Sequence, residues 1–483
     1  MRLRKSRAVV LFSSFIAILI FIQFFFSHHA KRMQWQRLRV TSSRCPDSPL
    51  LKDVFVVVRT GATEVLEKLP AHFSTVLTCI PDYIIYSDLE EYLEGHHIVD
   101  VLDRTSPDVK MHAPEFWLYN RLHTSGRENL DYKTTFGSGP GGALDNPGWK
   151  LDKWKFLPMV SRALEYRPQA KWFVFIEPDT YLFWQNMLEY LAQFDASKPY
   201  YLGRHMYIGP VLFAHGGSGF AISNPAMKMV SKHWMDNLAW FDDYTLKEWA
   251  GDMVLGKAME NIGVPLISAS PHVQGESLST VDWTNNRQNN PPWCYAPLTF
   301  HHMTDHQIHP LWNFERGWIR DHQVIKILRL RDIFRRLVYP QLRAEVIDWD
   351  NQSRELEYSN EALAKLSDTD RAALASAERG AQESFQHCQA ACESKKSCIQ
   401  FFYNPGRCFL STELRLGQMV QAGCIDYSPK ENKCVRVQDM GGSNALSKHT
   451  SAAVSGWIMD RVRQVTEEMD GACQSPGGND WVT

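Results

Sequence analysis

Alternation of apolar and polar segments along the chain predicts strands and helices in regular succession. The sequence from Asp53, DVFVVVRTGATEVLEKLPAHF, predicts a strand, a turn and a helix. Apolar runs at residues 83–88, 97–102 and 172–176 predict three more strands, and a helix is expected from about residue 150 to 166. Strands that alternate with helices indicate an α/β fold with much parallel pairing.

The first 26 residues have the pattern of a signal anchor. MRLRKSR carries four positive charges, and residues 8–26, AVVLFSSFIAILIFIQFFF, carry none. At about 1.5 Å per residue, this apolar stretch is just long enough to span a bilayer. A cleaved signal peptide is the alternative, although its apolar core is shorter and ends in small residues. The positive-inside rule predicts a cytosolic tail (1–7), a transmembrane helix (8–26) and a lumenal body.

Composition divides the rest of the chain into further segments. We expect a polar stem at 27–50, an α/β domain at 51–335, a charged helical connector at 336–380, a cysteine-rich module at 381–434 and a tail at 435–483. Most of the ten cysteines lie from Cys388 onward, which suits disulfides in an oxidising compartment. Asn351-Gln352-Ser353 is an N-glycosylation sequon that a lumenal location would make usable. This layout is typical of Golgi enzymes and predicts a single-pass type II protein of the Golgi or endoplasmic reticulum membrane.

Two carboxylates follow the buried strand at 172–176, in the sequence Glu177-Pro178-Asp179. A buried carboxylate is costly unless it is paired, hydrogen-bonded or bound to a cation. In open α/β sheets, ligands bind beyond the carboxyl ends of the strands, where these acids are expected. A cation site is one interpretation; a polar turn with a helix N-cap near Asp179 is the other.

Four segments in fixed order carry a family resemblance. They are EPDTY (177–181), HGGSGFAIS (215–223), GDMVLGKAM (251–259) and PLTFHHMTDH (297–306). They resemble the inverting glycosyltransferases of family 31, which include core 1 β-1,3-galactosyltransferase and Fringe; VVVRTGA and GWKLDKWKFLP are similar to a fungal branch. The resemblance covers residues 51–315. It implies a GT-A-type, Rossmann-like fold, a UDP-sugar donor and a divalent metal, usually Mn²⁺.

The resemblance also implies a metal site. Asp179 matches the aspartate that holds the metal, Glu177 matches the first acid of that motif, and Pro178 replaces the middle one. His301 matches the histidine that completes the site, with the register against His302 left open. A hard cation held by carboxylates can neutralise the charge that develops on a departing diphosphate.

Asp252 matches the family's candidate catalytic base, which takes the proton of the acceptor hydroxyl. The family commonly has an acid before it, where this chain has Gly251. An N-cap role for Asp252 is the alternative. Gly216, Gly217, Ser218 and Gly219 resemble the acceptor loop, or form an ordinary tight turn.

Arg59, Thr60 and Asp88 lie at the ends of the first two predicted strands, where the family holds the nucleotide; a plain turn role is equally consistent. Lys153 and Lys155 could reach the diphosphate, but a solvated helix face is the favoured interpretation.

Residues 388–408 resemble a PAN/apple domain, a small disulfide-rich fold. The resemblance implies disulfides Cys392–Cys398 and Cys388–Cys408. Such modules bind proteins or carbohydrates, so acceptor recognition and a purely structural role are both open.

These features predict an inverting glycosyltransferase that moves a hexose, galactose in β-1,3 linkage as first choice, from a UDP-sugar to a glycoprotein or glycan. The alternative, suggested by Pro178 and Gly251, is an inactive membrane-anchored receptor or lectin-like protein that binds through the PAN-like module. The net charge of −2 gives no indication of a nucleic-acid partner. A homodimer is left open.

Overall fold

A computed structural model describes residues 45–127, 130, 146–285, 292–322, 327–421, 424–430, 432–437, 452–473 and 481–482. The chain divides into two compact units, Met1–Cys45 and Pro46–Thr483, and the description below concerns the second. The predicted tail and anchor, and the stem up to residue 44, lie outside the described residues. None of the helices in the described ranges combines the length and the apolar character that a membrane span requires.

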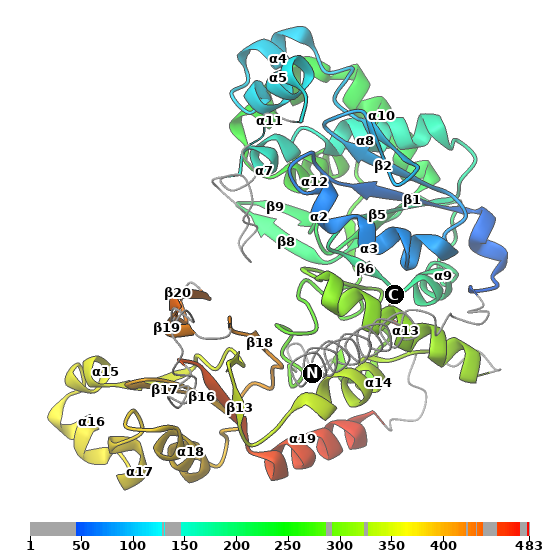
Figure 1. Cartoon of the computed structure of the whole chain (residues 1–483). Coiled ribbons are helices and arrows are strands. Elements are labelled where there is room, and N and C mark those ends of the chain that lie inside the picture. The colour runs from blue at the N-terminus through cyan, green and yellow to red at the C-terminus, as the bar shows by residue number, and fades with distance from the viewer. Residues whose placement is uncertain are drawn as a thin grey trace, which may run out of the picture. The chain divides into compact units, whose positions relative to one another are not determined.

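A mixed eight-stranded sheet is the centre of the N-terminal part (Figure 1). Its strand order is β11-β7-β10-β5-β1-β2-β4-β3. Strands β5, β1, β2 and β4 are parallel, as are β11 and β7, whereas β10 is antiparallel to both neighbours and β3 to β4. The bounds are β1 Val54–Arg59, β2 Tyr83–Ser87, β3 Glu91–Leu93, β4 His96–Asp100, β5 Trp172–Ile176, β7 Tyr201–Gly203, β10 Phe220–Ser223 and β11 Leu266–Ser268. The predicted α/β class is confirmed.

Residues 54–58 of strand β1 show why the central strands are mostly apolar. Val54, Val56 and Val58 enter one hydrophobic cluster, whereas Phe55 and Val57 enter another on the opposite face. Successive strand residues point to opposite faces, so a strand between two helix layers must be apolar at every position. Helices α8 (Phe156–Tyr166), α10 (Asn224–Asp236) and α12 (Gly251–Asn261) contribute to the Phe55 cluster; α3 (Pro70–Phe73), α9 (Trp184–Leu191) and α13 (Asp305–Asp321) contribute to the Val54 cluster.

Smaller elements complete this part of the chain. They are helices α2 Val65–Lys68, α4 Pro107–His112, α5 Phe116–Ser125, α7 Pro147–Asp152, α11 Leu238–Lys247 and α14 Leu330–Ile333, the pair β6 Tyr181–Leu182 and β12 Thr299–Phe300, and the hairpin of β8 His205–Ile208 and β9 Val211–Ala214.

The helix predicted over 150–166 is interrupted, because α7 ends at Asp152 and α8 begins at Phe156. Lys153 and Lys155, 6% and 1% exposed, turn into the protein at this break. Lys155 Nζ donates to Thr60 O over 2.7 Å and lies 2.9 Å from Asp88 Oδ2. The favoured solvated face for these lysines is therefore wrong, since their ionic and carbonyl partners satisfy them inside the fold.

The C-terminal part is built on an antiparallel five-stranded sheet of order β13-β21-β16-β17-β15. Helix α18 (Phe385–Ser394) is fixed by disulfides Cys388–Cys408 and Cys392–Cys398, the two pairs that the PAN resemblance implied. The sheet strands are β13 Val346–Ile347, β15 Leu356–Ser359, β16 Gln400–Asn404, β17 Arg407–Ser411 and β21 Val454–Trp457. The other elements are α15 Asn360–Ala364, α16 Asp368–Ala373, α17 Ser376–Arg379, α19 Met459–Ala472, β14 Trp349–Asp350, β18 Gln418–Met419, β19 Cys424–Ser428 and β20 Lys433–Val437.

This sheet changes the predicted boundaries. Strands β13 and β15 come from the expected connector (336–380), and β21 comes from the expected tail (435–483). Parts of both segments therefore belong to this sheet. Strands of two to four residues are too short to stand out from a charged, helix-rich background.

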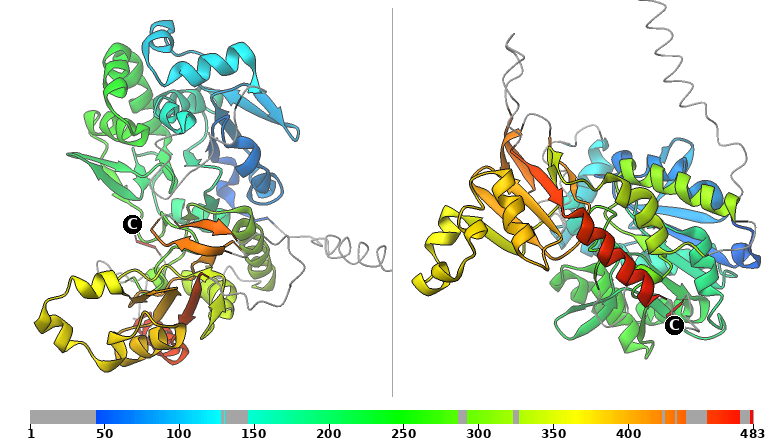
Figure 2. Two further views of the ribbon diagram at one scale, coloured as in Figure 1. Left: turned by 60° about the vertical axis from the view of Figure 1, so that its left-hand side comes forward. Right: turned by 90° about the horizontal axis from the view of Figure 1, so that it is seen from below.

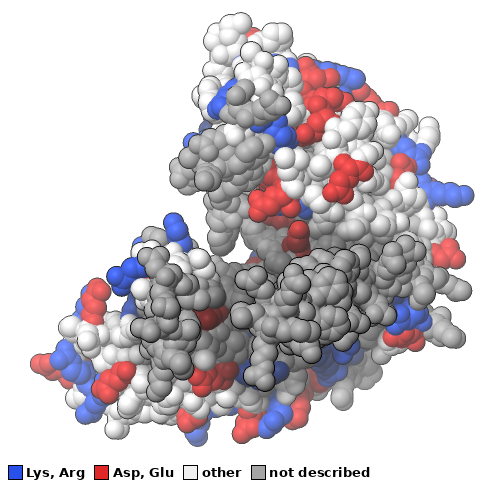
Figure 3. Space-filling model, viewed as in Figure 1, with Lys and Arg blue, Asp and Glu red and all other residues white. Residues whose placement is uncertain are grey.

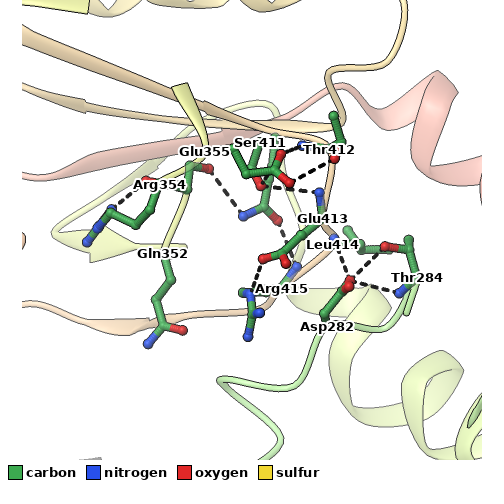
Figure 4. Close-up of polar contacts among 12 residues, drawn as sticks. Asp282, Thr284, Gln352, Arg354, Glu355, Ser411, Thr412, Glu413, Leu414 and Arg415 are labelled. Carbon is green, nitrogen blue, oxygen red and sulfur yellow. Dashed lines mark hydrogen bonds and ion pairs between the residues drawn. The ribbon is translucent and has the colours of Figure 1, made fainter. Parts of the chain in front are cut away.

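Several contacts join this sheet to the rest of the unit. Cys473, at the end of α19 (red in Figure 2), forms a disulfide with Cys294. Asp282 Oδ1 accepts hydrogen bonds from the backbone nitrogens of Leu414 and Thr284, over 3.2 and 3.0 Å (Figure 4). Cys424 and Cys434 pair across the β19–β20 hairpin.

The predicted glycosylation site lies in the interior. Asn351 is fully buried, and its Nδ2 donates to the carbonyls of Phe401 and Gly456 over 3.0 and 3.3 Å. Ser353 Oγ donates to Asn351 Oδ1 over 2.8 Å. A glycan on Nδ2 would displace these bonds and the surrounding sheet, so the prediction is wrong for the folded chain.

Candidate active site

A cavity of about 270 Å³ opens where β1 and β5 end. Its lining includes Arg59 at the end of β1, Glu177 and Asp179 after β5, Asp252 and His301. Acidic and basic side chains are interspersed over the face drawn in Figure 3, with no single sign of charge over the whole face. The electrostatics of the site therefore depend on the charged residues that line the cavity.

Asp179, His301 and His302 form a cluster that can hold a metal ion. One potential ligand atom from each lies within 4.8 Å of the others. His301 Nε2 is 3.4 Å from Asp179 Oδ1, and His302 Nδ1 is 4.0 Å from Asp179 Oδ2. Asp179 Oδ1 is buried without a hydrogen-bond partner in the described part of the chain, as expected for an oxygen that binds a cation. Carboxylate and imidazole ligands suit Mn²⁺, so these residues fit a divalent cation.

Strand pairing brings the cluster together. Strand β6, which starts two residues after Asp179, pairs antiparallel with β12, which ends one residue before His301. Met303 N also donates to Asp179 O over 2.9 Å. Helix α9 begins at Trp184 with Phe183 as N-cap, so an N-cap role for Asp179 is excluded.

The acidic turn is held by two further contacts. His72 Nε2 lies 2.8 Å from Pro178 O, and Thr180 Oγ1 donates to Gly217 O over 2.7 Å. Pro178 is thus bound through its carbonyl. Pro178 itself offers neither a backbone N–H nor the carboxylate that the family motif has at this position.

Charge pairing decides the ionisation of the cluster. Burial disfavours ionised carboxylates, but His301 and then Lys68, whose Nζ is 3.0 Å from Asp179 Oδ2, hold the pKa of Asp179 below its usual range. Burial would also raise the pKa of Glu177, but Arg59 and His301 lower it to about 2. Burial would lower the pKa of His301, but Asp179 and Glu177 raise it to about 9. A cation at this site would take the place of the imidazole proton.

Asp252 lies in the first turn of α12. Its Oδ2 accepts from Gly216 N over 2.9 Å, and its Oδ1 accepts from Met253 N over 2.9 Å. The N-cap of α12 is Ala250, so the capping role considered for Asp252 does not apply. Burial raises the pKa of Asp252 to about 6, near the range in which a carboxylate acts as a general base.

Packing explains why Gly251 replaces an acid. A Cβ at this position would lie 2.4 Å from Phe156 Cδ2 and 2.6 Å from Lys153 O. Contacts this short do not occur between non-bonded heavy atoms, so a side chain does not fit here without a shift of α8 or of the backbone before it.

The Gly-rich loop contacts both halves of the site. Gly216 binds Asp252 as described, and a Cβ on Gly217 would lie 2.2 Å from His301 Cε1. Ser218 Oγ lies 2.6 Å from His215 Nδ1, and Gly219 has φ +82°, which favours glycine. The loop thus admits the His301 ring; its predicted contact with an acceptor remains a prediction.

The predicted nucleotide contacts are divided between two locations. Arg59 lines the cavity and pairs with Glu177 and Asp152, and Lys153 and Lys155 line the cavity as well. Thr60 and Asp88 are buried, 1% and 0% exposed, and are not among the described lining residues. Asp88 instead accepts from Ala62 N over 2.7 Å and pairs with Lys155. Direct nucleotide contact by Thr60 and Asp88 is therefore not supported.

Sequence reasoning did not single out several further residues of the lining. Among them are Glu64, Lys68, Trp149, Asp152 and Trp249. Glu64 and Lys68 read as an ordinary i,i+4 pair on a helix. Trp249 stands three residues before Asp252, which is the one signal that could have drawn attention to it.

One comparison with known proteins bears on this site. A protein-family model described as Fringe-like matches residues 51–312, which is more than half of the chain. The matched segment contains the eight-stranded sheet, the Asp179 cluster and Asp252. Fringe-like proteins are glycosyltransferases of the β-1,3 type that use a UDP-sugar and a divalent metal. The chain belongs to the Fringe-like family of glycosyltransferases.

Proposed function

We propose that this chain is an inverting, metal-dependent transferase that moves a hexose from a UDP-sugar to a glycoprotein or glycan. Galactose in β-1,3 linkage is the first candidate. The observation that carries the proposal is that the Asp179–His301–His302 cluster and Asp252 line one cavity. Transfer requires a metal cluster and a base, since the diphosphate leaves the donor and a proton leaves the acceptor hydroxyl.

The charged residues of the cavity bind the donor. Asp179 and His301, with His302 as third ligand, hold Mn²⁺, which when bound neutralises charge on the diphosphate. Arg59 and Lys68 line the same cavity, each paired with its acids, and are the cations that a diphosphate would take over from those carboxylates.

Asp252 acts on the acceptor. Its carboxylate takes the proton of the acceptor hydroxyl while that oxygen attacks the anomeric carbon of the donor sugar. The bond from this carbon to the diphosphate breaks as the new bond forms, UDP leaves with the bonding electrons, and the configuration inverts. The Gly216 amide keeps the carboxylate oriented.

The protein is proposed to work in the Golgi or endoplasmic reticulum lumen, anchored by residues 8–26, with residues 51–335 as its catalytic part. The disulfides fit an oxidising compartment. The PAN-like module is proposed to assist acceptor or partner recognition.

UDP release from a panel of UDP-sugars, with Mn²⁺ or with chelator, tests the proposal. We expect Mn²⁺-dependent release that Asp179→Ala abolishes, while Asp243→Ala, an exposed acid of α11, leaves it unchanged. Release that persists with chelator and in Asp179→Ala would contradict metal dependence. UDP binding without turnover, over a broad set of glycan and glycopeptide acceptors, would favour the inactive alternative. A Cβ does not fit at Gly251 as packed, whereas the contact of His72 uses a backbone carbonyl that any residue at position 178 offers, so Pro178 still favours that alternative.

A further inference from the structure

The lining of the catalytic cavity falls into two groups of different chemistry. Helix α2, the acidic turn and the loop after β12 supply charged or metal-binding groups, among them Lys68, Asp179 and His301. Helix α7, the β8–β9 hairpin and the segment before α12 supply large apolar groups, among them Trp149, Met206 and Trp249, while the end of α7 and the residues after it also supply charged groups. Asp252 adjoins the second group in sequence.

Trp249 presents an exposed aromatic surface to this cavity. Its side chain stacks on Trp149, with ring centroids 6.0 Å apart and planes 24° apart, yet Trp249 remains 55% exposed. An indole this exposed in the lining of a cavity is a large surface that nothing in the described chain covers completely.

The position of Trp249 is fixed by a buried lysine. Lys153 Nζ donates to the carbonyls of Leu246 and Glu248, over 3.3 and 2.9 Å, and pairs with Glu115 Oε1 over 2.9 Å. The backbone on the N-terminal side of Trp249 is therefore anchored, and α12 begins two residues after it. A binding surface with an anchored backbone loses less conformational entropy on binding than one on a mobile segment.

We propose that Trp249, supported by Trp149, is the platform on which a pyranose ring of the acceptor stacks. This inference rests on the proposed function and assigns the acceptor to the glycans: a terminal pyranoside rather than a peptide hydroxyl. One face of many pyranosides carries C–H groups that pack against an aromatic ring, while the hydroxyls at the ring edge remain free to reach Asp252. The charged and metal-binding residues of the lining, among them Lys68, Asp179 and His301, then bind the diphosphate of the donor.

Ligand-observed NMR with methyl β-galactoside, methyl β-glucoside and methyl α-mannoside tests the platform independently of turnover. The full chain is used in a detergent without a sugar head group, with Mn²⁺ and UDP present. The variants are Trp249→Ala and Trp249→Phe, and the matched control is Trp240→Ala. Trp240 is 46% exposed and stacks on Tyr244, but it is not among the described lining residues.

We expect at least one pyranoside to bind, and Trp249→Ala to weaken that binding about tenfold. Trp249→Phe should retain most of the binding, and Trp240→Ala should not change it. UDP affinity, measured separately by calorimetry, should be equal in all four proteins. An equal loss of UDP and glycoside binding in Trp249→Ala would assign the ring to the nucleotide and overturn the proposal.

Unchanged glycoside binding in Trp249→Ala would also overturn the proposal, as would no pyranoside binding to a wild-type protein that binds UDP. A peptide acceptor that turns over equally well in Trp249→Ala would do the same. Failure of the wild type to bind UDP would instead count against the transferase itself.

Discussion

The backbone amide of Gly216 donates a hydrogen bond to Asp252 Oδ2 over 2.9 Å. This bond joins the Gly-rich loop to the proposed base and orients its carboxylate. It also lowers the pKa of Asp252, but burial has the larger effect and raises that pKa to about 6. Asp252 is therefore an oriented carboxylate that is ionised at neutral pH and more basic than an exposed aspartate.

This pKa predicts the pH dependence of transfer. Only the ionised carboxylate can accept the hydroxyl proton, so kcat/KM for the acceptor should fall about tenfold per pH unit below about 6 and be level above it. His215 and His302, whose pKa values burial lowers to about 4, titrate mainly at lower pH, so the bend near 6 is assigned to Asp252. Initial rates from pH 4.5 to 8 with saturating Mn²⁺ and donor measure the profile.

Asp252→Asn is the companion variant. The amide cannot take the proton, so we expect kcat to fall by about 10²–10⁴ while UDP affinity is retained. Folding should be preserved at pH 7, because burial disfavours the charge that the substitution removes. A profile that still bends near pH 6 in Asp252→Asn would assign the titration to another group.

Gly217→Ala tests the contact between the loop and the metal cluster. The added Cβ would lie 2.2 Å from His301 Cε1, so the imidazole must leave its position beside Asp179. We expect Mn²⁺ affinity, measured by electron paramagnetic resonance titration, to fall at least tenfold. Gly471→Ala in α19, where no atom lies within 4 Å of the added Cβ, is the control and should bind Mn²⁺ as the wild type does. Equal Mn²⁺ affinity in both variants would exclude His301 as a ligand.

The parts of the fold predicted from sequence are those whose pattern is local. Strand β5 and residues 54–58 of β1 are apolar at every position because helices cover both of their faces, and such a run can be recognised from the sequence alone. Asp179 and His301 were found by resemblance, and the structure brings them to 3.4 Å of one another.

The parts that could not be predicted depend on partners distant in sequence. Lys153 pairs with Glu115, and Lys155 pairs with Asp88. The sequence around the two lysines gives no sign of these distant partners, so a solvated helix face was the natural interpretation. The sequon at Asn351 is likewise a local signal, and its burial depends on the carbonyls of Phe401 and Gly456.

Burial of Asn351 predicts that the folded protein carries no glycan there. Mass spectrometry of peptides from protein secreted by a eukaryotic host should find Asn351 unmodified. Asn351→Gln should lower the free energy of unfolding by about 1–3 kcal/mol, because it disturbs buried hydrogen bonds. Ser353→Thr, which keeps both sequon and hydroxyl, is the milder control. A glycan on Asn351 in folded protein would contradict the structure.

Restoring an acid at position 251 tests the packing account of this site. In Gly251→Asp the new Cβ would meet Phe156 Cδ2 at 2.4 Å and Lys153 O at 2.6 Å. We expect an overpacking cost of about 1–3 kcal/mol, observed as a lower Tm, and reduced transfer because α12 carries Asp252. Phe156→Leu should recover part of the loss in the double variant, but not all of it, because the carbonyl of Lys153 is backbone and cannot be trimmed. If Gly251→Asp is as stable as the wild type and more active, the glycine is a lost catalytic acid rather than a packing requirement.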